Sequence, residues 1–156
     1  MEPILQVEHL KKVYADGTVA LEEINFDVYP GEFVAVIGPS GAGKSTLLRC
    51  INLLVTPTEG FVIFKGIEVN KESNRVVKQV RREIGMVFQS FHLVERLTVL
   101  NNVLHCRLGY SNTVRGAFGW FSKKDIAQAK EILKRVGLSE QMYKRADELS
   151  GGQMQR

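Results

Sequence analysis

The sequence has few of the residues that build metal clusters and disulfide frameworks. Its 156 residues include two cysteines, three histidines, four prolines and one tryptophan. Cys50 and Cys106 stand in no CxxC pair and lie at no metal-ligand spacing from a histidine, which argues against a zinc or redox site. We expect two buried free thiols in a reducing compartment, and a disulfide between them stays open as the alternative.

Long apolar runs and strong charge imbalance are also missing. No apolar run approaches the roughly 18 residues that a membrane-spanning helix needs, and residues 1–4 lack the build of a secretory signal. We therefore expect a cytoplasmic chain whose membrane role, if any, comes through a partner. The net charge is only +4, and no aromatic residues interleave with the short basic clusters, so we expect no nucleic-acid partner.

What remains is the composition of one soluble globular domain. Hydrophobic residues make up 44% of the chain and charged residues 24%, which is typical of a folded protein with a core. Residues 33–37 form a continuous, β-branched apolar run, as in a strand buried on both faces of a parallel sheet. Apolar patterning and turn residues predict strands at 5–10, 20–29, 33–37, 61–64 and 84–88, helices at 44–56, 76–83, 99–108 and 122–136, and a loop at 109–121.

A glycine-rich loop joins the apolar run at 33–37 to the predicted helix that begins at Lys44. Gly38, Gly43, Lys44 and Ser45 fill the fixed positions of GxxxxGK[ST], a phosphate-binding loop. In such a loop backbone N–H groups converge on phosphate oxygens, the lysine reaches the β- and γ-phosphates, and the hydroxyl binds Mg²⁺. The pattern thus predicts a nucleotide site with Ser45 as a metal ligand. The remaining loop positions are Pro39, Ser40, Gly41, Ala42 and Thr46.

A second glycine motif lies near the end of the sequence, where Leu149, Ser150, Gly151, Gly152 and Gln153 follow one another. Taken alone, a serine before two glycines is an ordinary helix cap. The alternative is a second anion site, built from the hydroxyl and the backbone N–H groups of a helix start. One nucleotide cannot easily use both motifs of one small chain, so the second motif would serve a nucleotide held by another copy.

Together the motifs resemble those of ABC-type ATPase subunits. The phosphate loop GPSGAGKST, the strand sequence IGMVFQ that ends at Gln89, and the signature LSGGQMQR occur in that family's order. The resemblance implies binding of ATP with Mg²⁺ and a head-to-tail dimer in which each signature contacts the partner's nucleotide. It implies that Tyr14 stacks on adenine, with Val19 nearby. It also implies that Lys44 and Gln89 are catalytic, and that Gln89 contacts the metal.

The resemblance also implies a fold class and a division of the chain. We expect an α/β P-loop NTPase of ABC type, with a mixed or parallel sheet core, an N-terminal antiparallel β subdomain and a helical subdomain. Residues 1–89 would form the β subdomain and the phosphate-loop core, and residues 90–156 the helical subdomain ending in the signature.

Part of the family's catalytic set has no counterpart in this sequence. The family places a strand ending in aspartate and glutamate, and later a histidine, after the signature. His9, His92 and His105 all precede it, so the base glutamate and the switch histidine are absent. The resemblance is thus to the first part of the domain. We expect this chain alone to bind ATP poorly or without turnover and to hydrolyse it negligibly.

The stretch after Gln89 resembles import subunits of the family through residues 91–105, and its phosphonate-import branch specifically through residues 107–125 and 146–149. This implies an ATPase, a translocase subunit, at the cytoplasmic face of the membrane, working with a permease and, indirectly, an external binding protein. Import of phosphate, phosphite or amino acids, a non-transport ABC ATPase, and a regulatory module without turnover are the alternatives. The aromatics that either anchor the permease or pack in the helical subdomain are Phe91, Phe118, Trp120 and Phe121.

Overall fold

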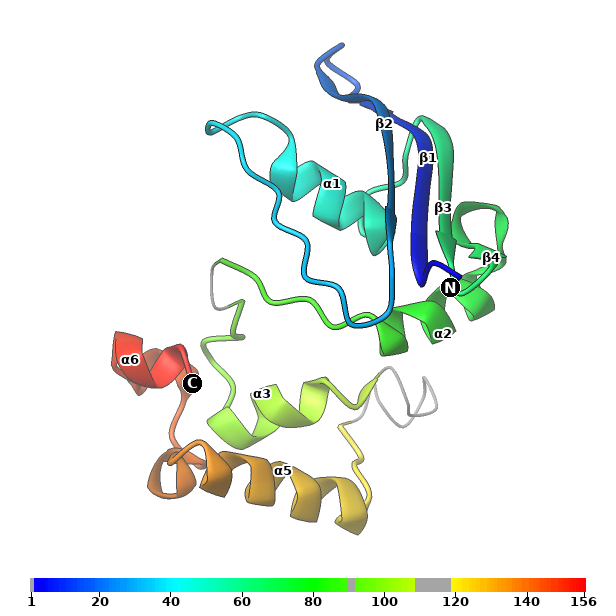
Figure 1. Cartoon of the computed structure of the whole chain (residues 1–156). Coiled ribbons are helices and arrows are strands. Elements are labelled where there is room, and N and C mark those ends of the chain that lie inside the picture. Colours follow the sequence, from blue (N-terminus) through cyan, green and yellow to red (C-terminus); the bar gives the residue numbers. More distant parts are fainter. Residues whose placement is uncertain (1, 90–91, 109–118) are drawn as a thin grey trace. The chain divides into compact units, whose positions relative to one another are not determined.

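The computed structural model describes residues 2–89, 92–108 and 119–156. The chain divides into two units, Met1–Met86 and Val87–Arg156 (Figure 1). Each unit is described by itself. Among the described residues, no helix combines the length and the apolar composition that crossing a bilayer requires.

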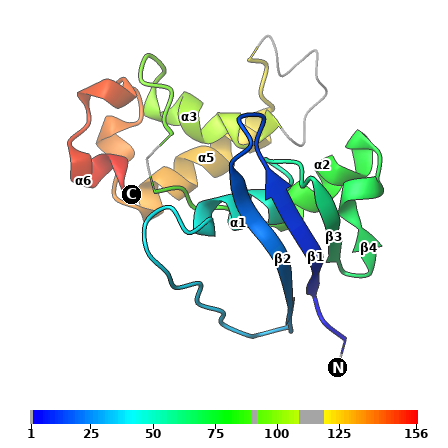
Figure 2. The same ribbon diagram turned by 90° about the horizontal axis from the view of Figure 1, so that it is seen from above.

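The first unit is built on a four-stranded antiparallel sheet (Figure 2). Its strands, in the order β2-β1-β3-β4, are β1 (Leu5–Val13), β2 (Val19–Val28), β3 (Glu59–Phe64) and β4 (Ile67–Glu68). The β1–β2 pairing runs from Leu5 opposite Val28 to Val13 opposite Val19. The strands predicted near residues 5–10, 20–29 and 61–64 are therefore confirmed.

Facing bulges in β1 and β2 set which side chains point into the core. His9 and Glu23 both have positive φ, 47° and 51°, and the His9 ring pairs with the Glu23 carboxylate. This hydrogen bond raises the pKa of His9 and lowers the pKa of Glu23. The bulge is also held by the His9 N–H, which donates to Asn25 Oδ1 at 2.7 Å. Consequently Val7 and Leu10, three positions apart, are both buried.

β3 comes unusually close to β1 at this bulge. Gly60 has φ of +84°, and a Cβ on it would lie 2.2 Å from the carbonyl oxygen of His9 and 2.5 Å from that of Glu8. No side chain fits at that separation, so the close pairing of β3 with β1 requires glycine here.

Two helices complete the first unit, α1 (Lys44–Ile51) and α2 (Asn74–Glu83), with the short η1 (Val69–Lys71) preceding α2. Buried side chains of α1 pack on the sheet in a core of Val7, Leu10, Leu21, Leu47, Cys50 and Val62. A second cluster joins β3, η1 and α2 and contains Phe64, Val69, Val77 and Val80. Alternate β3 residues contribute to the two clusters, which places both helices over one face of the sheet.

An arginine of α2 caps the end of α1. The Arg81 guanidinium donates to the carbonyl oxygens of Asn52 at 3.0 Å and Leu53 at 2.5 Å. These carbonyls lie just past the end of α1, where the backbone lacks helical partners and the helix dipole favours a cation. Arg81 therefore fixes the C-terminal end of the helix whose N-terminal end carries the glycine-rich loop.

The predicted strands at 33–37 and 84–88 are not formed. Both segments lack strand structure, and Phe33, Ile37 and Val87 are 93%, 92% and 98% exposed. An extended apolar segment becomes a strand only when neighbouring strands satisfy its backbone groups. The described residues pair no strand with either segment, so local β-propensity alone does not produce one.

The second unit is helical. It contains α3 (Val99–His105), α5 (Lys123–Arg135), α6 (Gly151–Met154) and the short turns η3 (Ser139–Gln141) and η4 (Ala146–Glu148). The predicted helix at 99–108 is thus three residues shorter than expected. The predicted loop at 109–121 lies mostly outside the described residues. The buried core between the helices consists of Val99, Leu100, Leu104, Ala129, Leu133, Leu138 and Leu149.

The start of α5 is fixed by local polar contacts. Ser122 is the N-cap, and its Oγ accepts from the Asp125 N–H at 3.1 Å. The Asp125 carboxylate accepts from Ser122 Oγ at 2.6 Å and from Arg107 Nε at 2.7 Å. These hydrogen bonds lower the pKa of Asp125. They also connect the end of α3 to the first turn of α5.

The cysteines are both free, but only one matches the expected burial. Cys50 is buried in the α1 core, whereas Cys106 is exposed. Burial raises the pKa of the Cys50 thiol. The prediction of two buried thiols is therefore wrong for Cys106, because α3 ends at His105 and the next residue lies beyond the helix–helix contact.

Candidate functional site

The glycine-rich loop leads directly into α1, as its sequence predicts. Gly43 is the N-cap of the helix with φ of +82°, and its carbonyl oxygen accepts the first helical bond from the Leu47 N–H at 2.8 Å. Within the loop, the Ala42 N–H donates to the Pro39 carbonyl at 3.3 Å. Residues 38–42 are exposed. The open start of α1 thus presents free backbone donors and a positive dipole end.

Gly43 also ties the loop to the sheet. A Cβ on this residue would lie 2.2 Å from the Ala20 carbonyl oxygen and 3.1 Å from Leu21 Cδ2. Gly43 is therefore required both for its left-handed conformation and for its contact with the backbone of β2. This contact sets where the N–H groups at the start of α1 stand relative to the β1–β2 hairpin.

Lys44 lies across the loop that precedes it. Its Nζ donates to the carbonyl oxygens of Gly38 at 2.7 Å and Pro39 at 2.6 Å. Two neutral acceptors hold the ammonium group in place. A negatively charged phosphate oxygen attracts the ammonium group more strongly than a neutral carbonyl oxygen does, so an incoming phosphate oxygen can replace either carbonyl. The arrangement is a cation fixed beside exposed N–H donors, suited to anion binding.

Tyr14 lies next to the first turn of α1. Its hydroxyl is 3.3 Å from Thr46 Oγ1, and the Lys12 Nζ is 5.4 Å from the centre of its ring. The tyrosine ends the β1 side of a hairpin closed by a hydrogen bond from the Tyr14 N–H to the Thr18 carbonyl. Tyr14 is 38% exposed and Val19, at the start of β2, 52%. The first unit thus brings the predicted base-stacking residues and the phosphate loop into one region.

Ser45 is the loop residue that suits a hard cation. It is exposed in the first turn of α1, and hydroxyl and phosphate oxygens are ligands that Mg²⁺ accepts. In the part of the chain that the structure describes, no group of three His, Cys, Asp or Glu side chains is placed to bind a metal ion. A metal here would therefore depend on the nucleotide's own oxygens.

The second unit holds the other predicted site residues. Gln89 is exposed near its beginning. Ser150 is the N-cap of α6, and its N–H donates to Gln153 Oε1 at 2.9 Å. Gly151 and Gly152 form the exposed first turn of that helix, and a Cβ on either would meet no atom within 4 Å. The two glycines leave the backbone open to a close approach from outside.

The predicted aromatic anchors differ in how far they are buried. Phe121 packs against the helical core and its ring centre lies 6.4 Å from that of His105, so it is a packing residue. Trp120 is 69% exposed. Phe91 and Phe118 lie outside the described residues.

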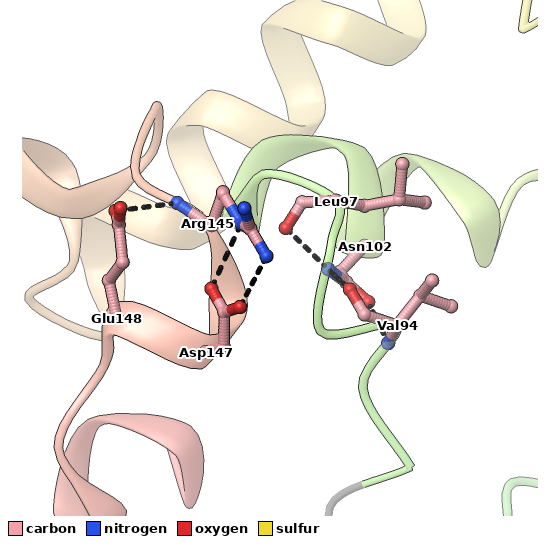
Figure 3. A network of polar contacts seen from close by, with 6 residues as sticks. All are labelled: Val94, Leu97, Asn102, Arg145, Asp147 and Glu148. Carbon is pink, nitrogen blue, oxygen red and sulfur yellow. Dashed lines mark hydrogen bonds and ion pairs between the residues drawn. The ribbon is translucent and has the colours of Figure 1, made fainter.

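The sequence does not predict the polar contacts that join α3 to the segment before it. Asn102 in α3 makes side-chain hydrogen bonds to the backbone of residues 94–98 (Figure 3). An asparagine in the first turns of a helix, behind a threonine cap, gives only a weak signal, because its partners are set by the fold.

Comparison with known proteins decides the family. The ABC transporter family model matches residues 21–156. This chain belongs to the ABC transporter family. It is 57% identical over 153 residues to phosphonates import ATP-binding protein PhnC 2 of Halalkalibacterium halodurans, covering 98% of this chain and 63% of that protein. It is 49% identical to the PhnC 2 protein of Oceanobacillus iheyensis, with 98% and 60% covered.

Solved structures agree with the ABC transporter assignment. The ATP-binding cassette MJ0796, in a dimeric post-hydrolysis state bound to ADP and Pi, superimposes with a TM-score of 0.79 at 35% identity, over 96% of this chain and 65% of that one. A nucleotide-free ATP-binding cassette superimposes with a TM-score of 0.77 at 28% identity, over 98% and 61%. The predicted ABC-type fold class is confirmed. The chain spans about 60% of the length of the relatives it matches.

Proposed function

We propose that this ABC transporter chain is the ATP-binding part of a subunit that drives phosphonate import. The observation that supports the proposal is the exposed phosphate loop, in which carbonyl oxygens hold the Lys44 ammonium group beside the free N–H donors of α1. The direction of transport and the solute are proposed from the relatives named phosphonates import ATP-binding proteins. ATP would bind through residues 38–46, with adenine against Tyr14.

The chemistry of the site is electrostatic. Mg²⁺ held by Ser45 and the phosphates would neutralise charge on the terminal phosphate. Lys44 would exchange its two carbonyl acceptors for β- and γ-phosphate oxygens, and the backbone donors at the start of α1 would bind the remaining oxygens. Gln89 would contact the metal and the attacking water.

The signature supports a role in assembly. Ser150 and Gly152 would bind the γ-phosphate held by a second copy, so that ATP stabilises a closed head-to-tail dimer because only that state makes both sets of contacts. The segment after Gln89 would receive the membrane permease at the cytoplasmic face, and an external binding protein would deliver phosphonate. The division of the domain at residue 89 belongs to this proposal.

Lys44→Ala tests the nucleotide site. We expect the dissociation constant for MgATP to rise at least about tenfold, because a charged hydrogen-bonding group is removed from the phosphates. Isothermal titration of the purified chain measures it. Lys78→Ala is the matched control, since Lys78 is an exposed lysine of α2 in the same unit. Equal affinity of Lys44→Ala and the parent chain would contradict the proposal.

The same substitution tests the transported solute in cells. A strain lacking the gene should lose growth on a phosphonate as the sole phosphorus source, and the wild-type gene, but not the Lys44→Ala gene, should restore it. Growth on inorganic phosphate is the control. Undiminished growth of the deletion strain on phosphonate would refute phosphonate as the solute. The ATP site would still be tested separately by the MgATP titration.

Ser150→Arg tests the contact between copies. We expect MgATP-dependent dimerisation to weaken at least about tenfold, because the bulk of an arginine side chain would obstruct the exposed start of α6, where the partner's γ-phosphate would approach. MgATP affinity of the monomer should stay unchanged. Sedimentation velocity with and without MgATP measures the association. Ser139→Arg, at the start of the exposed η3 turn, is the control, and equal dimerisation of both variants would disprove the role.

A further inference from the structure

The segment that follows Gln89 is held by the side-chain amide of one residue. Asn102 Oδ1 accepts from the Val94 N–H at 2.8 Å, and Asn102 Nδ2 donates to the Val94 carbonyl at 3.1 Å. The asparagine thus pairs with both the N–H and the carbonyl of Val94, as the backbone of a neighbouring strand would. The same Nδ2 also lies 3.1 Å from the Thr98 carbonyl and 3.4 Å from that of Leu97.

Hydrophobic packing of Val94 does not take over the role of the Asn102 side-chain amide. The Val94 side chain is 49% exposed, so its burial contributes little to holding the segment. The cap of α3 is a separate contact, in which the Asn101 N–H donates to Thr98 Oγ1 at 3.2 Å. Removal of the Asn102 side chain therefore leaves the helix cap in place and takes the acceptor from the Val94 N–H, while the Val94 carbonyl keeps its hydrogen bond from the Leu97 N–H at 3.0 Å.

The segment that Asn102 holds is paired with the residues that lead to the signature. The Asp147 N–H donates to the Glu95 carbonyl at 3.2 Å, and the Ala146 N–H to the Leu97 carbonyl at 3.0 Å. Residues 98 and 145 form an antiparallel bridge. Beyond it the Val99 N–H donates to the Lys144 carbonyl at 3.0 Å. Residues 95–99 and 144–147 therefore form a short antiparallel ladder within the second unit.

The far side of the ladder carries further polar contacts up to the signature serine. The Arg145 guanidinium binds the Asp147 carboxylate through two contacts, at 3.1 and 2.5 Å, and the Arg145 N–H donates to Glu148 Oε2 at 3.1 Å. Figure 3 shows this turn beside the segment held by Asn102. Leu149, which is 7% exposed, fixes the next position in the helical core. Ser150 follows directly.

We propose that Asn102 is a positioning residue that fixes the 94–98 segment and, through the ladder, the residues that place Ser150. The consequence rests on the proposed function: the segment that would meet the permease and the signature that would meet the partner's nucleotide then move as one body. Asn102 touches neither ligand itself. It acts through residues 95–99 and 144–147.

Amide hydrogen exchange on the whole chain tests the proposal without any ligand. In Asn102→Ala we expect the Val94, Ala146 and Asp147 amides to exchange about tenfold faster or more, because the hydrogen bonds that order their segment are lost. The Val136 amide at the end of α5, which donates to the Ile132 carbonyl, should change less than about threefold. Asn101→Ala is the matched control, an exposed asparagine one residue earlier in the same helix.

Two results would overturn the proposal. One is unchanged exchange at Ala146 and Asp147 in Asn102→Ala. The other is equal acceleration at Val136, which would make Asn102 a general stabiliser of the unit. If Asn102→Ala does not fold, amide hydrogen exchange of the unsubstituted chain provides the test. The Val94, Ala146 and Asp147 amides should then share one opening equilibrium, with protection factors within about threefold of one another. Separate openings would refute the ladder.

Nucleotide binding separates this proposal from the function on which it rests. Asn102→Ala should bind MgATP with the affinity of the parent chain, because Lys44 lies in the other unit. Loss of MgATP binding in Asn102→Ala alone would count against a role confined to the second unit. Absence of binding in the parent chain would refute the proposed function, while the exchange pattern would still decide the role of Asn102.

Discussion

Gly43→Ala is expected to destabilise the first unit by about 3–5 kcal/mol and to abolish nucleotide binding. Two costs add. Alanine at φ of +82° is strained by about 1–2 kcal/mol. In addition its Cβ would lie 2.2 Å from the Ala20 carbonyl oxygen, a backbone atom that cannot withdraw without disturbing β2. The loop would have to leave the sheet, and the N–H donors at the start of α1 would leave with it.

Urea titration followed by amide exchange of β1 and β2 measures this effect, and MgATP titration measures the loss of the site. Gly41→Ala is the matched control in the same loop, because Gly41 has φ of +84° and a Cβ there would meet nothing within 4 Å. The control should cost only the strain of the backbone, about 1–2 kcal/mol. Equal destabilisation by both substitutions would show that the approach of Gly43 to β2 is unimportant.

Leu133→Ala should lower the free energy of unfolding of the second unit by about 3 kcal/mol. Leu133 is 2% exposed and lies at the centre of the helical core with Leu104 and Leu149. Truncation removes buried apolar surface and leaves a cavity that the helices can only partly close. Because the unit depends on one small core, the loss is a large fraction of its total stability.

Trp120 makes the measurement specific, since it is the sole tryptophan and belongs to the second unit. Its fluorescence during urea unfolding should show a lower midpoint for Leu133→Ala. Ile132→Ala is the control one position earlier in α5, where the side chain is 49% exposed, and it should cost less than about 1 kcal/mol. Similar midpoints for the two variants would contradict the assigned core.

The features that the sequence predicted correctly are those encoded by adjacent residues. The glycines and Lys44 predict the loop and the start of α1, and apolar spacing predicts the helix at 122–136 that forms as α5. Both depend on contacts within a few positions of the chain. The ABC-type fold followed from the order of three such local motifs.

The features that the sequence did not predict depend on residues far apart. The run at 33–37 has strand propensity but no partner strand among the described residues, so it stays irregular. The bulges need His9 and Glu23 to adopt positive φ, which no residue type in the pattern signals. Asn102 gains its role only when residues 94–98 and 144–147 come together. In each case the deciding partner lies elsewhere in the fold.

The irregular run at 33–37 also affects how the chain behaves in concentrated solution. Phe33-Val34-Ala35-Val36-Ile37 carries no charge and no proline, and its terminal side chains are more than nine-tenths exposed. Such a pentapeptide is a template on which a second extended chain can add. We therefore expect the purified chain to aggregate faster as its concentration is raised, which light scattering measures.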